Sequence, residues 1–318
     1  MENGKFIISL DFELHWGAAE KWDLKLKKGY FDTTRESIPK VLLLFEKYNI
    51  HATWATVGFL FAKNKKQLLE FCPVVRPTYQ NGLLSYYSLI ENDEVGENEI
   101  DDPYHYAPSL IALILKTPNQ EVGTHTFSHY YCNEKGQNKH QFEADLIAAQ
   151  CLAKENFNIE LKSLVFPRNQ FNADYIDVAK RNGIKVVRTN PDVWFWKSTA
   201  DIMSLARGLD TLIQISKKLV FSVPHQIHDD FLLLPASRFF RPYREKEKLI
   251  QRLKIQRIIN EMTFAAKHNK AYHLWWHPHN FGYFLDDNMF YLEIILNHYQ
   301  KLNAKYGFVS SSMSGLYL

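Results

Sequence analysis

Short apolar, β-branched segments alternate along this sequence with longer segments of helical periodicity. The strand-like segments lie at residues 6–10, 51–57, 121–124, 163–166, 185–188, 219–223, 271–276 and 308–310. Strand, helix and strand joined by short links are typical of parallel α/β sheets. With about seven such repeats and no glycine-rich phosphate loop, we predict a distorted, seven-stranded parallel (β/α) barrel and not a dinucleotide-binding fold.

Helical segments are expected between these strands. The sequence at residues 33–36 resembles a capping box and predicts a helix from there to about residue 48. Further helices are expected at residues 59–71, 141–156, 173–182, 201–212, 246–268 and 289–305. Residues 72–120 break the alternation with Pro, Asn, Tyr and an acidic cluster, so we interpret them as an insertion that partly covers a site.

The composition restricts the class of protein more than its function. Length alone does not decide between one domain and two, but barrel-type α/β folds often use about this length as one, and we expect residues 1–318 to form a single catalytic domain. A formal charge of +3 is too small to indicate nucleic-acid binding. The three cysteines, Cys72, Cys132 and Cys151, leave one unpaired and lack a metal-type spacing, which indicates a reducing compartment. No apolar run approaches the roughly 18 residues of a membrane span, and Lys5 and Asp11 interrupt any signal-like segment, so we expect a cytoplasmic protein.

Ionisable residues follow several of the predicted strands at the point where each ends. Asp11 and Glu13 end the first strand, and Arg168 follows the strand at residues 163–166. The histidines of residues 125–129 and 277–279 follow two others. In a parallel barrel these ends share one rim, where catalytic groups lie. The sequence therefore predicts an active site there.

The first strand places two acids on one face. Residues two apart on a strand point to the same side, so Asp11 and Glu13 project together and Phe12 points away. Two neighbouring carboxylates are costly to bury unless a cation lies beside them. A bound metal ion is the simplest such cation.

The H-x-x-x-H sequence from His125 to His129 supplies imidazoles at a spacing that suits a divalent metal. By itself this pair is weak evidence, because two nearby histidines can simply be solvated. Glu13 would complete a set of two histidines and one carboxylate with open coordination positions, which is the catalytic pattern. Zinc is the first choice, and cobalt, nickel, iron and manganese also fit.

With Glu13 as a ligand, Asp11 is free to act as a base toward water activated by the metal. A turn acid at the strand end is the alternative for Asp11, and metal binding by both acids stays open. Arg168 could pair with Asp11 and hold it ionised, although an ordinary surface salt bridge is the more common fate of an arginine.

A late histidine is expected to protonate the leaving group. His277 follows an apolar strand between Trp276 and Pro278, a partly desolvated setting. His279 or His273 could fill this role instead. Asp192 could orient the histidine, or could be a turn residue after Pro191.

The aromatic content of 14%, with seven Trp, suits either stacking on sugar rings or a large aromatic core. We predict that Trp16, Trp276 and Asn169 contact the substrate.

Four motifs give the chain a resemblance to the polysaccharide deacetylase family, the NodB-homology domain of carbohydrate esterase family four. They are S-L-D-F-E at residues 9–13, H-T-F-S-H at 125–129, F-P-R-N-Q at 166–170 and L-W-W-H-P at 274–278. The resemblance implies a (β/α) barrel that lacks one repeat, a divalent metal held by one acid and two histidines, and hydrolysis of an N-acyl or O-acyl group.

Two motifs depart from the family pattern. Phe12 separates acids that are usually adjacent, which transfers the ligand role to Glu13. The third motif has Pro167 before Arg168 and no proline after it. Both departures indicate an atypical branch, which includes enzymes acting on small cyclic amides.

We therefore predict a metal-dependent hydrolase that removes an N-acetyl or other acyl group from a sugar, in surface-polysaccharide or glycan precursor metabolism. The alternatives are an allantoinase-like hydrolase of cyclic amides and a catalytically degenerate carbohydrate-binding protein. Residues 238–257 carry eight Lys or Arg. They could rest on an anionic membrane, but an amphipathic helix with a solvated basic face fits them better. The oligomeric state is left open.

Overall fold

A single curled parallel sheet forms the centre of the protein. The computed structural model describes residues 3–191, 193, 217–222 and 231–317. Its strands run in the order β6-β5-β4-β3-β2-β1-β8-β7, and β9 pairs with β1 beside this path. The strands are β1 (Lys5–Phe12), β2 (Ala52–Thr56), β3 (Gln120–Thr124), β4 (Ser163–Val165), β5 (Val186–Thr189), β6 (Leu232–Pro235), β7 (Arg238–Phe239), β8 (Ala271–Trp276) and β9 (Val309–Ser311).

All of these strand pairs are parallel. Among the described residues β6 and β7 lie at the two ends of the order and do not pair, so the sheet is an open half-barrel. The predicted distorted parallel barrel is confirmed.

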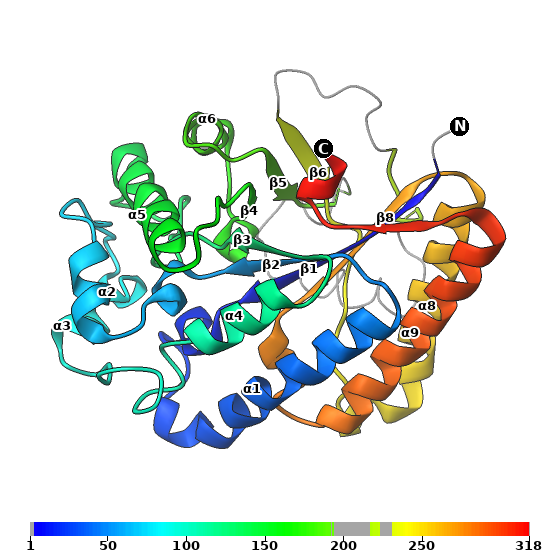
Figure 1. The fold of residues 1–318 in the computed structure, drawn as a ribbon, viewed down its shortest axis with the longest axis horizontal. Coiled ribbons are helices and arrows are strands. Elements are labelled where there is room, and N and C mark those ends of the chain that lie inside the picture. The colour runs from blue at the N-terminus through cyan, green and yellow to red at the C-terminus, as the bar shows by residue number, and fades with distance from the viewer. Residues whose placement is uncertain (1–2, 192, 194–216, 223–230, 318) are drawn as a thin grey trace.

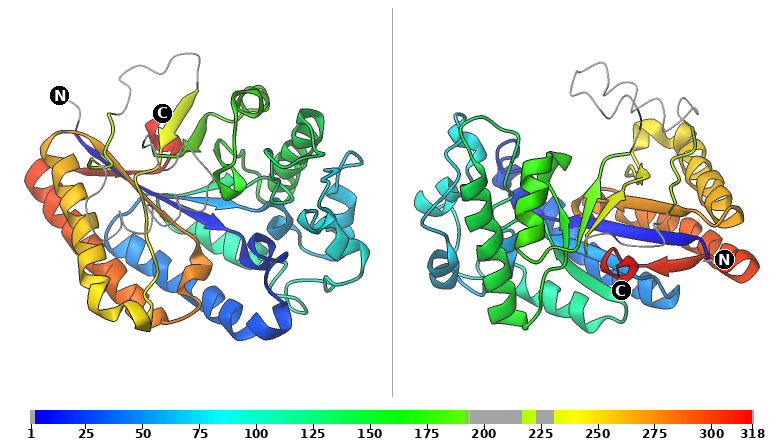
Figure 2. Two further views of the ribbon diagram at one scale, coloured as in Figure 1. Left: turned by 180° about the vertical axis from the view of Figure 1, so that it is seen from behind. Right: turned by 90° about the horizontal axis from the view of Figure 1, so that it is seen from above.

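Helices surround the sheet (Figures 1 and 2). They are α1 (Leu24–Lys47), α2 (Lys65–Phe71), α3 (Tyr87–Glu91), α4 (Pro108–Lys116), α5 (Lys139–Phe157), α6 (Ala173–Arg181), α8 (Lys248–Lys267) and α9 (Leu285–Tyr306). Figure 1 shows α1, α4, α8 and α9 along one side of the sheet, with α5 and α6 on the other flank. In the described ranges, no helix has both the length and the apolar character needed to cross a membrane.

The expected elements differ from the observed ones in a few places. Of the strand expected at 219–223, the described residues 219–222 form an isolated antiparallel bridge between Phe221 and Ala271, and residue 223 lies outside the described residues. Strands β6 and β7 were not expected. Asp23 caps α1, which begins at Leu24 and not at the capping box at residues 33–36. The Thr33 and Thr34 hydroxyls instead bond carbonyls one turn earlier inside the helix. The predicted helix at 201–212 lies outside the described residues.

Side chains of β1 alternate between two environments. Phe6, Ile8, Leu10 and Phe12 belong to the largest apolar cluster, which includes residues of the surrounding helices. Ile7 belongs to a separate cluster with residues of β2, β4, β5, β6 and β8, inside the curl of the sheet. The period of two places Asp11 on that inner face and Phe12 on the outer one, as predicted.

The insertion at residues 72–120 contains α3 and α4 and packs with buried tyrosines, including Tyr86, Tyr87 and Tyr106. Tyr86 stacks on His129 with ring centroids 5.8 Å apart. The insertion therefore reaches the predicted rim.

The basic segment at residues 238–257 does not form a continuous solvated face. Arg238, Lys254 and Arg257 are buried. Arg238 and Arg257 pair with Glu261, and Lys254 pairs with Glu247. Part of the positive charge is thus neutralised within the fold, which weighs against the membrane interpretation.

Candidate active site

A cavity of about 290 Å³ opens where the strands end. It brings together acids, histidines and an arginine that are far apart in the sequence. Its lining is Asp11, Glu13, Gly17, Ala18, Lys21, Trp22, His129, Arg168, Asn169, His277 and His279. Ionisable groups from several strand ends therefore converge on one rim, as the sequence predicts.

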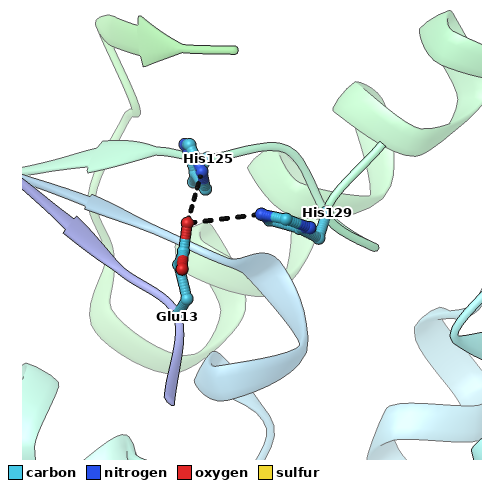
Figure 3. Close-up of side chains that lie close together, drawn as sticks. All are labelled: Glu13, His125 and His129. Atoms are coloured by element: carbon cyan, nitrogen blue, oxygen red, sulfur yellow. Dashed lines mark hydrogen bonds and ion pairs between the residues drawn. The ribbon is translucent and has the colours of Figure 1, made fainter. Parts of the chain in front are cut away.

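Glu13, His125 and His129 form a compact buried cluster (Figure 3). Glu13 Oε1 lies 2.9 Å from His125 Nε2 and 3.3 Å from His129 Nε2. One ligand atom from each residue lies within 4.8 Å of the others. Such a set of one carboxylate and two imidazoles can hold a divalent metal and leave coordination positions open.

The loop that carries both histidines begins where β3 ends. His125 N–H donates to the Thr56 carbonyl at 2.9 Å, which continues the ladder from β2. Thr126 and His129 have φ angles of +64° and +57°, in the left-handed region that few non-glycine residues adopt.

Asp145 on α5 holds this loop in place. Its carboxylate accepts hydrogen bonds from Phe127 N–H at 2.6 Å, from Ser128 N–H at 3.1 Å and from the Ser128 hydroxyl. Asp145 is fully buried. It fixes the turn that aims both imidazoles at Glu13, and no sequence pattern singled it out.

The tautomer of His125 fits a metal ligand. Its Nδ1 lies 2.7 Å from the Val165 carbonyl oxygen, which can only accept, so Nδ1 carries the proton. In the neutral ring Nε2 then presents a lone pair toward Glu13 Oε1, 2.9 Å away, and no proton lies between these two acceptor atoms. A metal ion between the imidazole and the carboxylate would satisfy both.

Glu13 is ionised, which is the form that binds a metal ion. Burial would raise the pKa of Glu13, but the charge of the neighbouring His277 is the largest of the effects that oppose burial and hold the pKa well below its usual value. The residues present therefore fit a divalent metal.

Asp11 pairs with Arg188, not with Arg168. Arg188 at the end of β5 donates to both oxygens of Asp11, at 2.6 and 2.7 Å. It also donates to Ser9 Oγ and to Asn169 Oδ1, both at 3.0 Å. Burial would raise the pKa of Asp11, but the charge of Arg188, followed by that of His277, lowers it overall. Asp11 is thus held ionised and oriented.

Arg168 has a different partner from the one predicted. It pairs with Glu20, and its guanidinium lies 4.2 Å from the centre of the Tyr131 ring. The prediction that Arg168 orients Asp11 was wrong, because Arg188 occupies that place. A charged residue within an apolar strand that ends at the catalytic rim was the signal that could have identified Arg188.

His277 lies between the two acids. Its Nε2 is 3.7 Å from Asp11 Oδ2 and 3.6 Å from Glu13 Oε1, and its side chain is 24% exposed. His279 is more buried, and its ion-pair contact is with Glu13, with Nδ1 3.7 Å from Oε2. Burial and the neighbouring His277 lower the pKa of His279 to about 3. The geometry therefore favours His277 over His279 as the proton donor.

The third candidate for this role is remote. His273 lies inside the sheet, with Nε2 2.8 Å from Ser9 Oγ and Nδ1 3.2 Å from the Pro235 carbonyl oxygen. Asp192, which was expected to orient the histidine, lies outside the described residues.

The predicted substrate contacts are only partly supported. Trp16 and Trp276 are fully buried, where they pack against Phe59 and Phe281 and cannot meet a substrate. Asn169 does line the cavity, and so does the half-buried Trp22. Trp22 was missed because the sequence places it in a loop without a motif.

Comparisons with known proteins agree with this geometry. A family model described as Polysaccharide deacetylase matches residues 27–187, about half of the chain. No curated protein sequence matches the chain.

Solved structures share the fold at low identity. A protein from Mycobacterium smegmatis described as a polysaccharide deacetylase has a TM-score of 0.62 at 12% identity, over 99% of this chain and 89% of its own. One from Pseudomonas aeruginosa PAO1 with the same description has a TM-score of 0.58 at 8% identity, over 98% and 89%. Puue allantoinase has a TM-score of 0.57 at 7% identity, over 98% and 88%. At these identities the likeness concerns the fold alone.

Proposed function

Because this chain belongs to the polysaccharide deacetylase family, we propose that it is a metal-dependent hydrolase that removes an N-acetyl or other acyl group from a sugar. The observation that carries the proposal is the convergence of Glu13, His125 and His129 on one point beside the Arg188-bound Asp11. The first set fits a metal, and Asp11 fits a base. A carbohydrate-binding scaffold without activity would need neither.

Glu13 Oε1, His125 Nε2 and His129 Nε2 would hold the metal. When bound, a divalent ion, with zinc as the first choice, would polarise the acyl carbonyl and lower the pKa of water at the site. These three residues leave open the positions that substrate and water need.

Asp11 would accept the proton from the attacking water. Its two oxygens each accept one hydrogen bond from Arg188, and each keeps a further lone pair. The arginine orients the carboxylate and keeps it ionised before the reaction, so no reorganisation is needed when the proton moves.

His277 would donate a proton to the leaving amine. Its Nε2 faces the cavity near both acids, while its partly exposed ring can exchange protons with solvent. Protonation of the nitrogen lets the C–N bond of the tetrahedral intermediate break with an amine as the leaving group.

The size and lining of the cavity support a small acylated unit. A cavity of about 290 Å³ accommodates one sugar ring, and Trp22 offers an aromatic surface at its edge. We place the substrate among glycans or glycan precursors of surface-polysaccharide metabolism.

The test is acyl release by the purified protein with added zinc or cobalt. The substrates are N-acetylated sugars, chito-oligomers and nucleotide sugars, with allantoin as the cyclic-amide alternative. We expect acetate from a sugar. We expect Asp11→Asn to lower kcat about 10²–10⁴-fold while metal content stays unchanged.

Two results would count against the proposal. Hydrolysis of allantoin alone would replace the sugar with a cyclic amide. Equal metal content in the wild-type protein and in a His125→Ala, His129→Ala double variant would remove the metal centre from these residues.

A further inference from the structure

A chain of buried hydrogen bonds leads from His129 away from the cavity. His129 Nδ1 lies 2.9 Å from the Tyr131 hydroxyl, which lies 2.9 Å from the Tyr86 hydroxyl. The Tyr86 hydroxyl in turn bonds the carboxylate of Glu20. His129, Tyr86 and Tyr131 are each at most 2% exposed, so water does not compete along this path.

The carboxylate of Glu20, at the far end, fixes which group donates and which accepts in each hydrogen bond of this chain. Glu20 pairs with Arg168 and lies 3.4 Å from Lys21 Nζ, so it is ionised and can only accept. Tyr86 must then donate its proton to Glu20 and accept from Tyr131. Tyr131 in turn accepts from His129, which places the ring proton on Nδ1.

This direction leaves the other ring nitrogen free for a ligand. With Nδ1 protonated, the neutral imidazole carries its lone pair on Nε2, the atom that faces Glu13 at 3.3 Å. The carbonyl of Val165 does the same for His125. The two imidazoles thus reach the same tautomer by different means.

The hydrogen-bond chain joins segments that are distant in the sequence. Glu20 lies before α1, Tyr86 lies in the insertion at 72–120, Tyr131 follows the histidine loop and Arg168 follows β4. Ring contacts strengthen the assembly, since Tyr86 stacks on His129 and Arg168 lies over Tyr131. The insertion and the third motif therefore meet behind one imidazole.

We propose that Glu20, Tyr86 and Tyr131 are positioning residues that hold His129 in the Nδ1-protonated tautomer and the ring orientation required for metal binding, with Arg168 anchoring the chain. This inference rests on the metal centre of the proposed function. It gives the atypical third motif and the insertion a role in preparing that centre.

The first experiment uses the metal-free protein and no substrate. Long-range ¹H–¹⁵N spectra of the histidine rings report which nitrogen carries the proton. We expect His129 protonated on Nδ1 in the wild-type protein and a mixture of tautomers in Tyr131→Phe. An Nε2-protonated His129 in the wild type would overturn the proposal, even if the enzyme proves active.

The second experiment measures the Kd for Zn²⁺ by competition with a chelator. We expect Tyr131→Phe to weaken binding about 10–100-fold. The matched control is Tyr130→Phe, which removes a hydroxyl from the next residue, where it bonds Gln137 and Asn138 instead of the metal ligands. Equal losses in the two variants would overturn the proposal, because they would reflect general loosening.

The links should also act in series. Tyr86→Phe removes the acceptor of Tyr131, so we expect a smaller loss of zinc affinity than in Tyr131→Phe. The double variant should be no weaker than Tyr131→Phe alone, because the second link has no role once the first is cut. Additive losses would contradict a chain. Absence of zinc binding in the wild-type protein would refute the proposed function. The tautomer measurement would still test the proposed role of the hydrogen-bond chain.

Discussion

At the scale of single residues, the site depends on how each charge is held. Asp11 is buried, and a buried carboxylate ionises readily only with a compensating charge. Arg188 supplies that charge through two parallel hydrogen bonds, a geometry that lysine cannot reproduce.

We expect Arg188→Lys to lower kcat about 10²-fold or more, because the base would lose its orientation and part of its charge compensation. Metal content should stay at the wild-type level, since the hydrogen bonds of Arg188 within the described part of the chain go to Ser9, Asp11 and Asn169 and not to Glu13, His125 or His129. Steady-state kinetics and metal analysis check this prediction. The control Arg181→Lys changes an exposed arginine on α6 and should leave both quantities unchanged. An unaltered kcat in Arg188→Lys would remove Arg188 from the machinery.

The positions of individual residues were predictable where they depend on chain order, and not where they depend on the fold. Glu13, His125 and His129 could be selected because strand ends and short motifs determine their placement. Arg168 follows one predicted strand and Arg188 ends another, so the sequence alone did not tell which one reaches Asp11. In the folded chain Arg188 reaches Asp11, whereas Arg168, with a positive φ of 53°, pairs with Glu20.

At the scale of elements, α5 supports the loop that carries His125 and His129, although that loop precedes the helix in the sequence. Asp145 accepts three hydrogen bonds from the turn between the two histidines. The strand ending at Thr124 and the helix beginning at Lys139 thus cooperate to build the ligand loop.

We expect Asp145→Asn to weaken zinc binding and to lower the free energy of unfolding by about 1–3 kcal/mol. An amide has one acceptor oxygen in place of two, so a buried N–H of the loop would lose its partner. Zinc titration and denaturant unfolding measure the two effects. The exposed Asp177 on α6 provides the control Asp177→Asn, which should change neither. Full zinc affinity in Asp145→Asn would show that the loop needs no support from α5.

The elements of the fold were largely predictable because their periodicity is strong. The exceptions have local causes. The two-residue β7 is too short for a period to be recognised, and β6, with the sequence L-L-L-P, contains no β-branched residue. The start of α1 was misplaced because threonines inside the helix bond their own backbone and imitate a cap.

At the scale of the whole molecule, the interior of the half-barrel buries the neutral His273 near the charged Arg188. Burial, together with the nearby Arg188, lowers the pKa of His273 to about 3. The unfolded chain has its ordinary value near 6.5. Between these values only the unfolded state takes up the proton, so stability is present above about pH 6.5 and is lost as the pH falls.

We therefore expect the free energy of unfolding of the metal-free protein to fall toward acid, with His273 contributing about 1.4 kcal/mol per pH unit below pH 6. Denaturant unfolding from pH 7 to pH 5 in the presence of a chelator measures this slope. In His273→Gln we expect this slope to be shallower by about 1.4 kcal/mol per pH unit, because one proton fewer is taken up on unfolding. The exposed His140, replaced by Gln, should retain the wild-type slope. An identical slope in His273→Gln would show that His273 does not control acid stability.

The bond between Asp11 and Arg188 spans the curl of the sheet. β1 and β5 are separated by β4, β3 and β2 in the strand order, yet Arg188 of β5 reaches across to Asp11 and Ser9 of β1. The width of the barrel mouth and the protonation of the base are therefore coupled. A substitution in β2, β3 or β4 that flattens the sheet would pull Arg188 from Asp11, so strand curvature itself becomes a determinant of catalytic rate.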